Sequence, residues 1–176
     1  MAMAWGTGCL SLGRRSRWLF TIRGDDPDGM LRKAAEMAAG RWVSSAGLDV
    51  RVVDKGPGDL TVQWVTRDEM AKQANAILPD QPGLSDNVAG GLTVNPSPGV
   101  HHILIRNDLG FDRAMSFLTH EMAHAITESG EHSAHGVYSP INYPGTQITE
   151  DDLNTVCSYV DCVFAKPEPD PAEQTG

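Results

Sequence analysis

The spacing of apolar residues near the start of the chain predicts one strand followed by one long helix. Residues 17–23, RWLFTIR, combine aromatic and β-branched side chains, and the turn-forming run GDDPDG follows them directly. From Met30 onward, apolar residues recur at intervals of three and four positions until Gly47, a residue type that commonly ends helices. This pattern predicts a helix of about 17 residues.

Four later segments have the alternation or composition of β-strands. Residues 48–54 and 60–66 alternate apolar and polar side chains, which is typical of strands with one buried face. GGLTVN (90–95) and HHILIR (101–106) are two further candidate strands, joined by a proline-rich turn. Residues 67–77 fit a short helix that ends at the run LPDQPG, so the main order is strand, helix and then four strands.

Two helices are predicted in the last third of the chain. The first follows Leu109 and ends before Gly130, and its apolar stripe comprises Met115, Leu118, Met122 and Ile126. The second begins at Thr149, which can cap it together with Asp152, and its buried face comprises Leu153, Val156, Cys157 and Val160. All elements together predict an α+β fold, with an α/β-type mixed, twisted sheet of about five strands and a small C-terminal part that ends in a helix.

The length and charge of the chain limit the classes of function. The 176 residues predict a single domain over 1–165, with subdomains over about 14–130 and 131–165, and a disordered tail over 166–176. Acidic residues outnumber basic ones by 23 to 14, which disfavours a nucleic-acid partner. No apolar run approaches the roughly 20 residues of a membrane span, and no secretory signal is recognisable. We therefore expect a monomer without a membrane partner, cytoplasmic or virus-encoded rather than classically secreted.

The three cysteines do not predict a disulfide framework. Cys157 and Cys162 lie five residues apart in the predicted last helix, which would place them about 140° apart around its axis. We therefore expect no bond between them. Cys162 is instead a candidate partner of Cys9 in the N-terminal arm.

Histidines are concentrated in one segment. Four of the six fall between residues 120 and 135, a local enrichment typical of metal binding. Two of them belong to HEMAH, residues 120–124, in the middle of the amphipathic helix. Positions i and i+4 share one face of a helix, so His120 and His124 can direct ring nitrogens toward a single ion. Glu121 lies beside that face, where its carboxylate can hold a water bound to the ion.

A catalytic zinc site needs three protein ligands and one open position, so a third ligand is required. His132 and His135 both follow Gly130, a residue that can turn the chain back toward the ion, and we favour His132. Glu128, on the same helix as the first two ligands, would need a strained geometry. Two alternatives stay open: a gluzincin-like site with Glu150 as the third ligand, and a closed, non-catalytic structural or interaction site in which all four clustered histidines are ligands.

These motifs resemble those of the metzincin superfamily of zinc endopeptidases, and most closely its matrixin branch. The resemblance rests on H-E-x-x-H at 120–124, a following glycine, His132 with Ser133, GVYSP at 136–140 and ITEDDLNTV at 148–156. The order of elements upstream is also similar, so the likeness extends over roughly residues 17–164. Two features differ from the family: the third histidine comes two residues later, and Tyr138 stands in place of the methionine of the Met-turn.

The resemblance implies a metzincin-like fold and a zinc-dependent endopeptidase. The zinc ligands that it implies are His120, His124 and His132. Glu121 would act as the general base, and Tyr143 or Tyr138 would assist the oxyanion. The segment GLTVN would be the sheet edge along which an extended peptide or protein substrate binds. Matrixins often hold a structural Ca²⁺ ion, but no loop pattern supports one at the candidates Asp86, Asn107 and Asp108.

Overall fold

The computed structural model describes residues 15–77, 90–140 and 143–169. Its elements follow the predicted order. They are β1 (Arg17–Arg23), α1 (Met30–Ala46), β2 (Asp49–Val53), β3 (Leu60–Val65), α2 (Arg67–Ile77), β4 (Gly91–Ser97), β5 (Val100–Arg106), α4 (Phe111–Thr127) and α5 (Glu150–Tyr159). The predicted α+β class is confirmed, as is the sheet of five strands.

One mixed sheet contains the five strands in the order β2-β1-β3-β5-β4. β1 pairs in parallel with β2 and β3, and β3 pairs in parallel with β5. β4 is antiparallel to β5, with Gly91 opposite Ile105 and Thr93 opposite Ile103. Since β4 ends the strand order, the prediction that the segment GLTVN is a sheet edge is confirmed.

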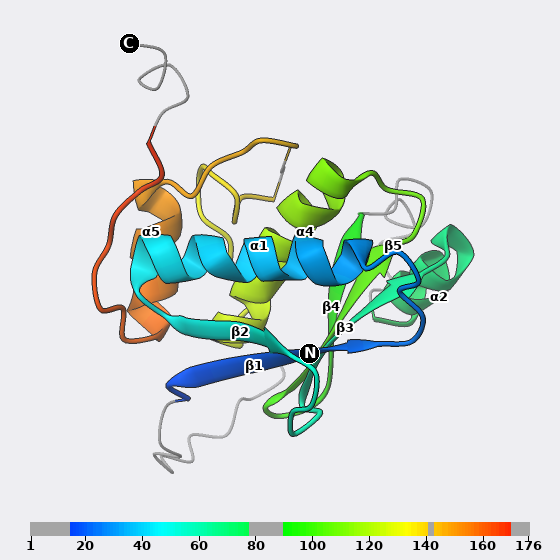
Figure 1. Ribbon diagram of the computed structural model, residues 1–176. Coiled ribbons are helices and arrows are strands. Elements are labelled where there is room, and N and C mark those ends of the chain that lie inside the picture. The colour runs from blue at the N-terminus through cyan, green and yellow to red at the C-terminus, as the bar shows by residue number, and fades with distance from the viewer. Residues whose placement is uncertain (1–14, 78–89, 141–142, 170–176) are drawn as a thin grey trace, which may run out of the picture.

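Helices cover both faces of this sheet. Ile103 and Ile105 of β5 belong to the main core, which also contains Leu118 and other residues of α4 and many residues of α1. Leu104, between them, points to the opposite face and forms a second cluster with Met70 of α2. Figure 1 shows α1 lying lengthwise over the sheet, with α5 beside the C-terminal end of α1.

A hydrogen bond from α1 to α4 fixes α4 at the point where the histidines begin. The Trp42 side chain is fully buried, and its indole Nε1 donates to the carbonyl of Thr119 over 2.9 Å. Thr119 directly precedes His120. α1 itself ends at Gly47, whose left-handed backbone (φ 65°) lets its N–H donate to the carbonyl of Val43.

Cys157 and Cys162 form a disulfide bond, so the prediction that they would not bond is wrong. That prediction assumed a helix continuing through Cys162. α5 instead ends at Tyr159, and Val160 has an extended backbone at the C-cap. The chain then turns so that the two Cα atoms lie 5.4 Å apart, a separation that a disulfide bridges readily. The expected pairing of Cys162 with Cys9, which lies outside the described residues, is therefore wrong as well.

The first part of the predicted disordered tail, residues 166–169, lies against the domain. The N–H of Lys166 donates to the carbonyl of Ser45, and the N–H of Glu168 donates to the carbonyl of Ile148. The Glu168 carboxylate also accepts two hydrogen bonds from Arg41, over 2.7 and 2.8 Å. The rest of the predicted tail, 170–176, lies outside the described residues.

Within the described ranges, no helix is both long and apolar enough to cross a bilayer.

Candidate metal centre

α4 places the first two predicted ligands at the boundary between core and surface. Leu118 and Met122, on the apolar stripe of the helix, are fully buried. His120 and Glu121, which lie between these two residues in sequence, are 8% and 6% exposed to solvent. His124 is half-buried. The helix is therefore anchored by its apolar stripe, while His120, Glu121 and His124 lie at the margin of that stripe.

The chain reverses direction at the end of α4. Glu128 occupies the C-cap with a left-handed backbone, φ 52°, a conformation that residues other than glycine seldom adopt. We expected Gly130 to make this turn, but Gly130 does not have a positive φ, so that expectation is wrong. The reversal at Glu128 returns His132 to the helix.

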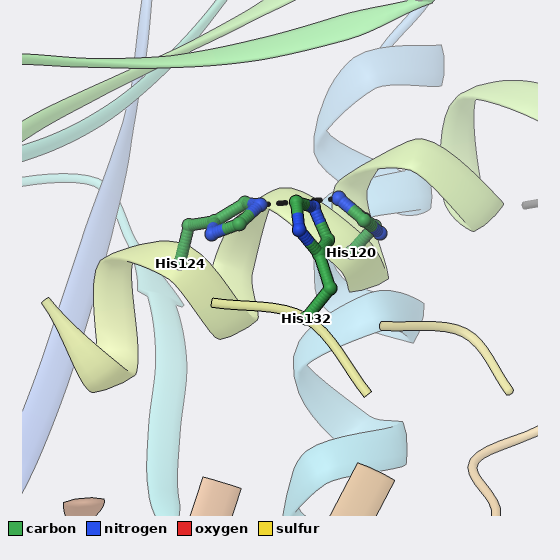
Figure 2. A group of neighbouring side chains, drawn as sticks. All are labelled: His120, His124 and His132. Atoms are coloured by element: carbon green, nitrogen blue, oxygen red, sulfur yellow. Dashed lines mark hydrogen bonds between the residues drawn. The ribbon is translucent and has the colours of Figure 1, made fainter. Parts of the chain in front are cut away.

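The three predicted ligands converge on one point. His120, His124 and His132 each offer a nitrogen atom, and these atoms all lie within 4.8 Å of one another. Figure 2 shows the rings of His120 and His124, both from α4, facing each other, with the ring of His132 from the following segment between them. The Nε2 atoms of His120 and His124 are 3.1 Å apart. Two ligands held about 2.0–2.1 Å from a tetrahedral ion would be separated by roughly 3.3 Å.

Backbone carbonyls determine which ring nitrogens carry protons. Nδ1 of His120 lies 2.9 Å from the carbonyl oxygen of Val137, and Nδ1 of His124 lies 2.8 Å from that of Ser129. A carbonyl oxygen can only accept, so each Nδ1 must be the protonated donor. In the neutral rings each Nε2 then carries a free lone pair. This arrangement is typical of histidine ligands, whose second nitrogen donates to a carbonyl or carboxylate.

The two Nε2 lone pairs facing each other require a positive charge between them. A proton shared by the two nitrogens would supply this charge. However, burial lowers the pKa of His124, and repulsion by His120 lowers it further, although the negative charge of Glu121 opposes both effects. Burial, together with His124 and His120, lowers the pKa of His132 to about 4. The rings of His124 and His132 therefore favour the neutral form near pH 7, and a metal cation fits the donor set better than a proton.

Tyr138 lies beneath the three histidines. It is fully buried, and its ring centroid is 4.9 Å from that of His124 and 5.6 Å from those of His120 and His132. Burial raises the pKa of its hydroxyl to about 12, so the hydroxyl keeps its proton. Tyr138 thus packs against the histidine group and brings a hydroxyl to the position where the resemblance would place a thioether.

A buried carboxylate holds the segment that carries this tyrosine. Asp152 of α5 is fully buried and accepts the backbone N–H groups of Val137 and Tyr138, each over 2.9 Å. It also accepts the hydroxyl of Ser133 and the N–H of Thr149. The carbonyl of Val137 is the group that orients His120. Asp152 therefore holds both this carbonyl and the segment that carries His132.

The carboxylate of Glu121 is held at the sheet edge. Its Oε2 accepts a hydrogen bond of 2.7 Å from the hydroxyl of Thr93 on β4. Glu121 also raises the pKa of His124 through its negative charge, so its carboxylate acts electrostatically on the metal site. This placement is compatible with the predicted role of Glu121 beside the ion.

The other predicted candidates lie outside the group of three. His135 is 81% exposed and pairs with Asp151 over 2.7 Å, so the structure brings three rather than four histidines together. Glu150 lies in the first turn of α5 and does not belong to the group of possible ligands among the described residues. Tyr143 is 67% exposed, and its carbonyl accepts from the hydroxyl of Ser116, one turn before His120.

Tyr143 also lines a small cavity beside α4. The cavity has a volume of about 210 Å³, and its walls are Arg113, Ser116, Phe117, Tyr143 and Pro144. The predicted oxyanion role of Tyr143 stays a prediction.

The calcium candidates gain no support. Asp108 forms a bidentate ion pair with Arg106, which lowers the pKa of its carboxyl group. Asp86 lies outside the described residues. The described residues contain only the histidine group as a cluster of three or more candidate ligands.

Two contacts near the histidine group were not predicted from the sequence. Asp152 was recognised as part of a capping box, which the structure confirms, but not as the acceptor for the turn beneath the histidines. Thr93 carried no signal, because its contact with Glu121 joins residues 28 positions apart. Only the strand register could have predicted it.

Comparison with known proteins adds little to this geometry. No protein-family model matches the chain, and no curated protein matches it significantly. Two solved structures of myroilysin are similar to it. One is 14% identical, covers 63% of this chain and has a TM-score of 0.39; the other is 12% identical, covers 94% and has a TM-score of 0.45. The chain spans 50% and 69% of the two myroilysin chains, and at these TM-scores the likeness carries no argument.

Proposed function

We propose that this chain is a zinc-dependent endopeptidase of the metzincin type. The observation that carries the proposal is the convergence of three imidazoles, two of which direct Nδ1 to a backbone carbonyl, beside the carboxylate of Glu121. Three histidine ligands with an open fourth position are typical of catalytic zinc. A zinc ion held by these rings would lower the pKa of a bound water to about 7 and polarise a substrate carbonyl.

In this mechanism each residue of the chain has a distinct task. The three histidines supply the lone pairs, and burial favours the neutral form of His124 and His132. The Glu121 carboxylate takes the proton of the attacking water and later delivers it to the leaving amine. β4 is the edge strand of the sheet in the described part of the chain, so its outer backbone groups can pair with an extended peptide substrate. Tyr143 is the candidate for contact with the oxyanion, and we expect the enzyme to act as a monomer without nucleic acid or membrane.

Metal content tests the ligand set. We expect about one zinc ion per chain in the wild type, determined by elemental analysis on protein purified without a metal-binding tag. His132→Ala should lose the metal, whereas His135→Ala and Glu150→Ala should keep it. A wild type that takes up no zinc would overturn the proposal, and loss in Glu150→Ala but not in His132→Ala would indicate the gluzincin-like alternative.

Hydrolysis of an unstructured protein tests the activity. Glu121→Ala should retain zinc and lower kcat by about 10²- to 10⁴-fold, the usual range for loss of a general base. Cobalt-substituted protein should change its visible spectrum when a hydroxamate occupies the open position. Zinc binding without hydrolysis, together with a cobalt spectrum that ignores hydroxamate, would identify a closed structural site instead.

A further inference from the structure

The Glu121 carboxylate has one hydrogen-bond donor among the described residues. The Thr93 hydroxyl lies 2.7 Å from Oε2 and 3.1 Å from the backbone oxygen of the same residue. No lysine or arginine pairs with Glu121 in the described part of the chain. Among the described residues, a single hydroxyl on β4 therefore provides the only hydrogen bond to this carboxylate.

Gly91 and Thr93 of β4 restrict the position of this carboxylate. Side chains alternate along a strand, and Leu92 and Val94 belong to the cluster on the opposite face, so positions 91 and 93 face α4. At position 91 a Cβ atom would lie 2.9 Å from Cγ and 3.3 Å from Oε1 of Glu121. The absence of a side chain at Gly91 thus leaves room for the Glu121 side chain, and Thr93 fixes its end.

Restricting the Glu121 side chain matters if its carboxylate is a general base, because a base must lie close to the proton that it takes. Glutamate has three rotatable side-chain bonds, and an unrestrained carboxylate samples several positions. A general base works only when its oxygen lies about 2.6–3.2 Å from the proton that it takes. A donor bound to one oxygen restricts the rotamers and leaves the other oxygen available.

We propose that Thr93 is a positioning residue, whose hydroxyl holds the Glu121 carboxylate in the orientation required for proton transfer. This inference rests on the proposed peptidase function. It adds that the strand offered to the substrate also aligns the base. Substrate pairing and base alignment would then depend on one element, β4.

Three variants separate this role from a general structural one. Thr93→Val keeps the shape of the side chain but removes the hydroxyl, and Thr93→Ser keeps the hydroxyl. Thr61→Val is the matched control, because it removes a buried strand hydroxyl whose partner is Nδ1 of His102. Steady-state kinetics on an unstructured protein and zinc analysis are performed on each.

Thr93→Val should lower kcat by about 10- to 100-fold, the effect of misplacing a catalytic group by about 1 Å, with KM changed less than about twofold. Zinc content should stay the same, Thr93→Ser should recover most of the activity, and Thr61→Val should leave kcat unchanged. An unchanged kcat in Thr93→Val, a loss that Thr93→Ser does not recover, or a loss of zinc would each overturn the inference.

A second measurement does not need activity. In urea unfolding of metal-free protein, Thr93→Val should lower the midpoint more when Glu121 is present than in the Glu121→Ala background. In that background the hydrogen bond to the carboxylate is already absent, and only the contact with the backbone oxygen of residue 121 is left to lose. Equal shifts in both backgrounds would overturn the inference. A wild type that hydrolyses nothing while this coupling is observed would instead contradict only the peptidase function.

Discussion

The hydroxyl oxygen of Tyr138 lies 3.1 Å from Nδ1 of His124, the ring nitrogen that does not face His120. The same hydroxyl lies 3.2 Å from Oγ1 of Thr127. Since the Nδ1 proton points toward the carbonyl of Ser129, the tyrosine oxygen is a second acceptor near that proton. Tyr138 therefore helps to orient His124 and to keep Nε2 available as a ligand.

Removal of this hydroxyl should weaken metal binding without unfolding the protein. Tyr138→Phe preserves the buried ring, and we expect zinc affinity to fall by about 10-fold, at the lower end of the range for partners of metal ligands. Competition with a chromophoric chelator measures this change. Tyr143→Phe, which changes an exposed tyrosine, should have no effect on affinity. Equal affinity in Tyr138→Phe and the wild type would show that the hydroxyl does not influence the site.

Asp152 should be essential for both stability and metal binding. Asp152→Ala removes the acceptor of the N–H groups of Tyr138 and Thr149, at a cost of about 3 kcal/mol or more in the free energy of unfolding. The N–H of Val137 loses the same acceptor but keeps the carbonyl of Gln147. Urea unfolding of the metal-free protein measures the cost. Chelator competition should also show weaker zinc binding, because the segment 133–138 loses its anchor.

The neighbouring aspartate provides the control for Asp152. Asp151→Ala removes the side-chain contact with His135, in which both side chains are substantially exposed, and one of three acidic residues in the first turn of α5. This change should alter the unfolding free energy by less than about 1 kcal/mol. If Asp151→Ala were as damaging as Asp152→Ala, the effect would come from the helix N-terminus rather than from the turn beneath the histidines.

Local patterns in the sequence were sufficient for the elements and for most of the site. Alternation predicted the strands, and the i, i+4 rule predicted that His120 and His124 share a helix face. The proximity of His132 was also predicted, although the turn occurs at Glu128 rather than at Gly130. A histidine a few residues beyond the helix end can reach the ion whichever residue makes the reversal.

Contacts that depend on long-range packing were not predictable. The Cys157–Cys162 disulfide requires that α5 end at Tyr159, yet Val160 continues the apolar spacing of the helix, and so the pattern suggested no stop there. The contact of Thr93 with Glu121 depends on the position of β4 relative to α4. Spacing along the chain contains no information about that position.

The ion pair between Glu168 and Arg41 should make the stability of the protein depend on pH. Burial alone would raise the pKa of Glu168, but the hydrogen bonds from Arg41 and from the N–H of Ile148 outweigh it, so the pKa is lowered. A lowered pKa in the folded state means that the stabilisation is present above the unfolded pKa of about 4.5. It is lost as the pH falls through the folded value.

We therefore expect Glu168→Gln to lower the unfolding free energy by about 2 kcal/mol at pH 7. The difference from the wild type should shrink below pH 4.5 and nearly vanish at strongly acidic pH. Urea unfolding across this pH range provides the measurement. A difference that stays constant with pH would mean that the charge of Glu168 does not contribute.

The disulfide between Cys157 and Cys162 should stabilise the end of α5 and the chain that follows. The bond closes a loop of five residues, for which the chain-entropy account gives about 2 kcal/mol. Replacement of both cysteines by serine should lower the unfolding free energy by about this amount in urea. The thiol content of the unfolded wild type should correspond to Cys9 alone.

The N–H of Val163, next to this bond, donates to the carbonyl of Ala46. Loss of the bond should loosen this contact, so proteolysis after residue 160 should become faster in the double variant. Unchanged stability, or three free thiols in the wild type, would contradict the bond.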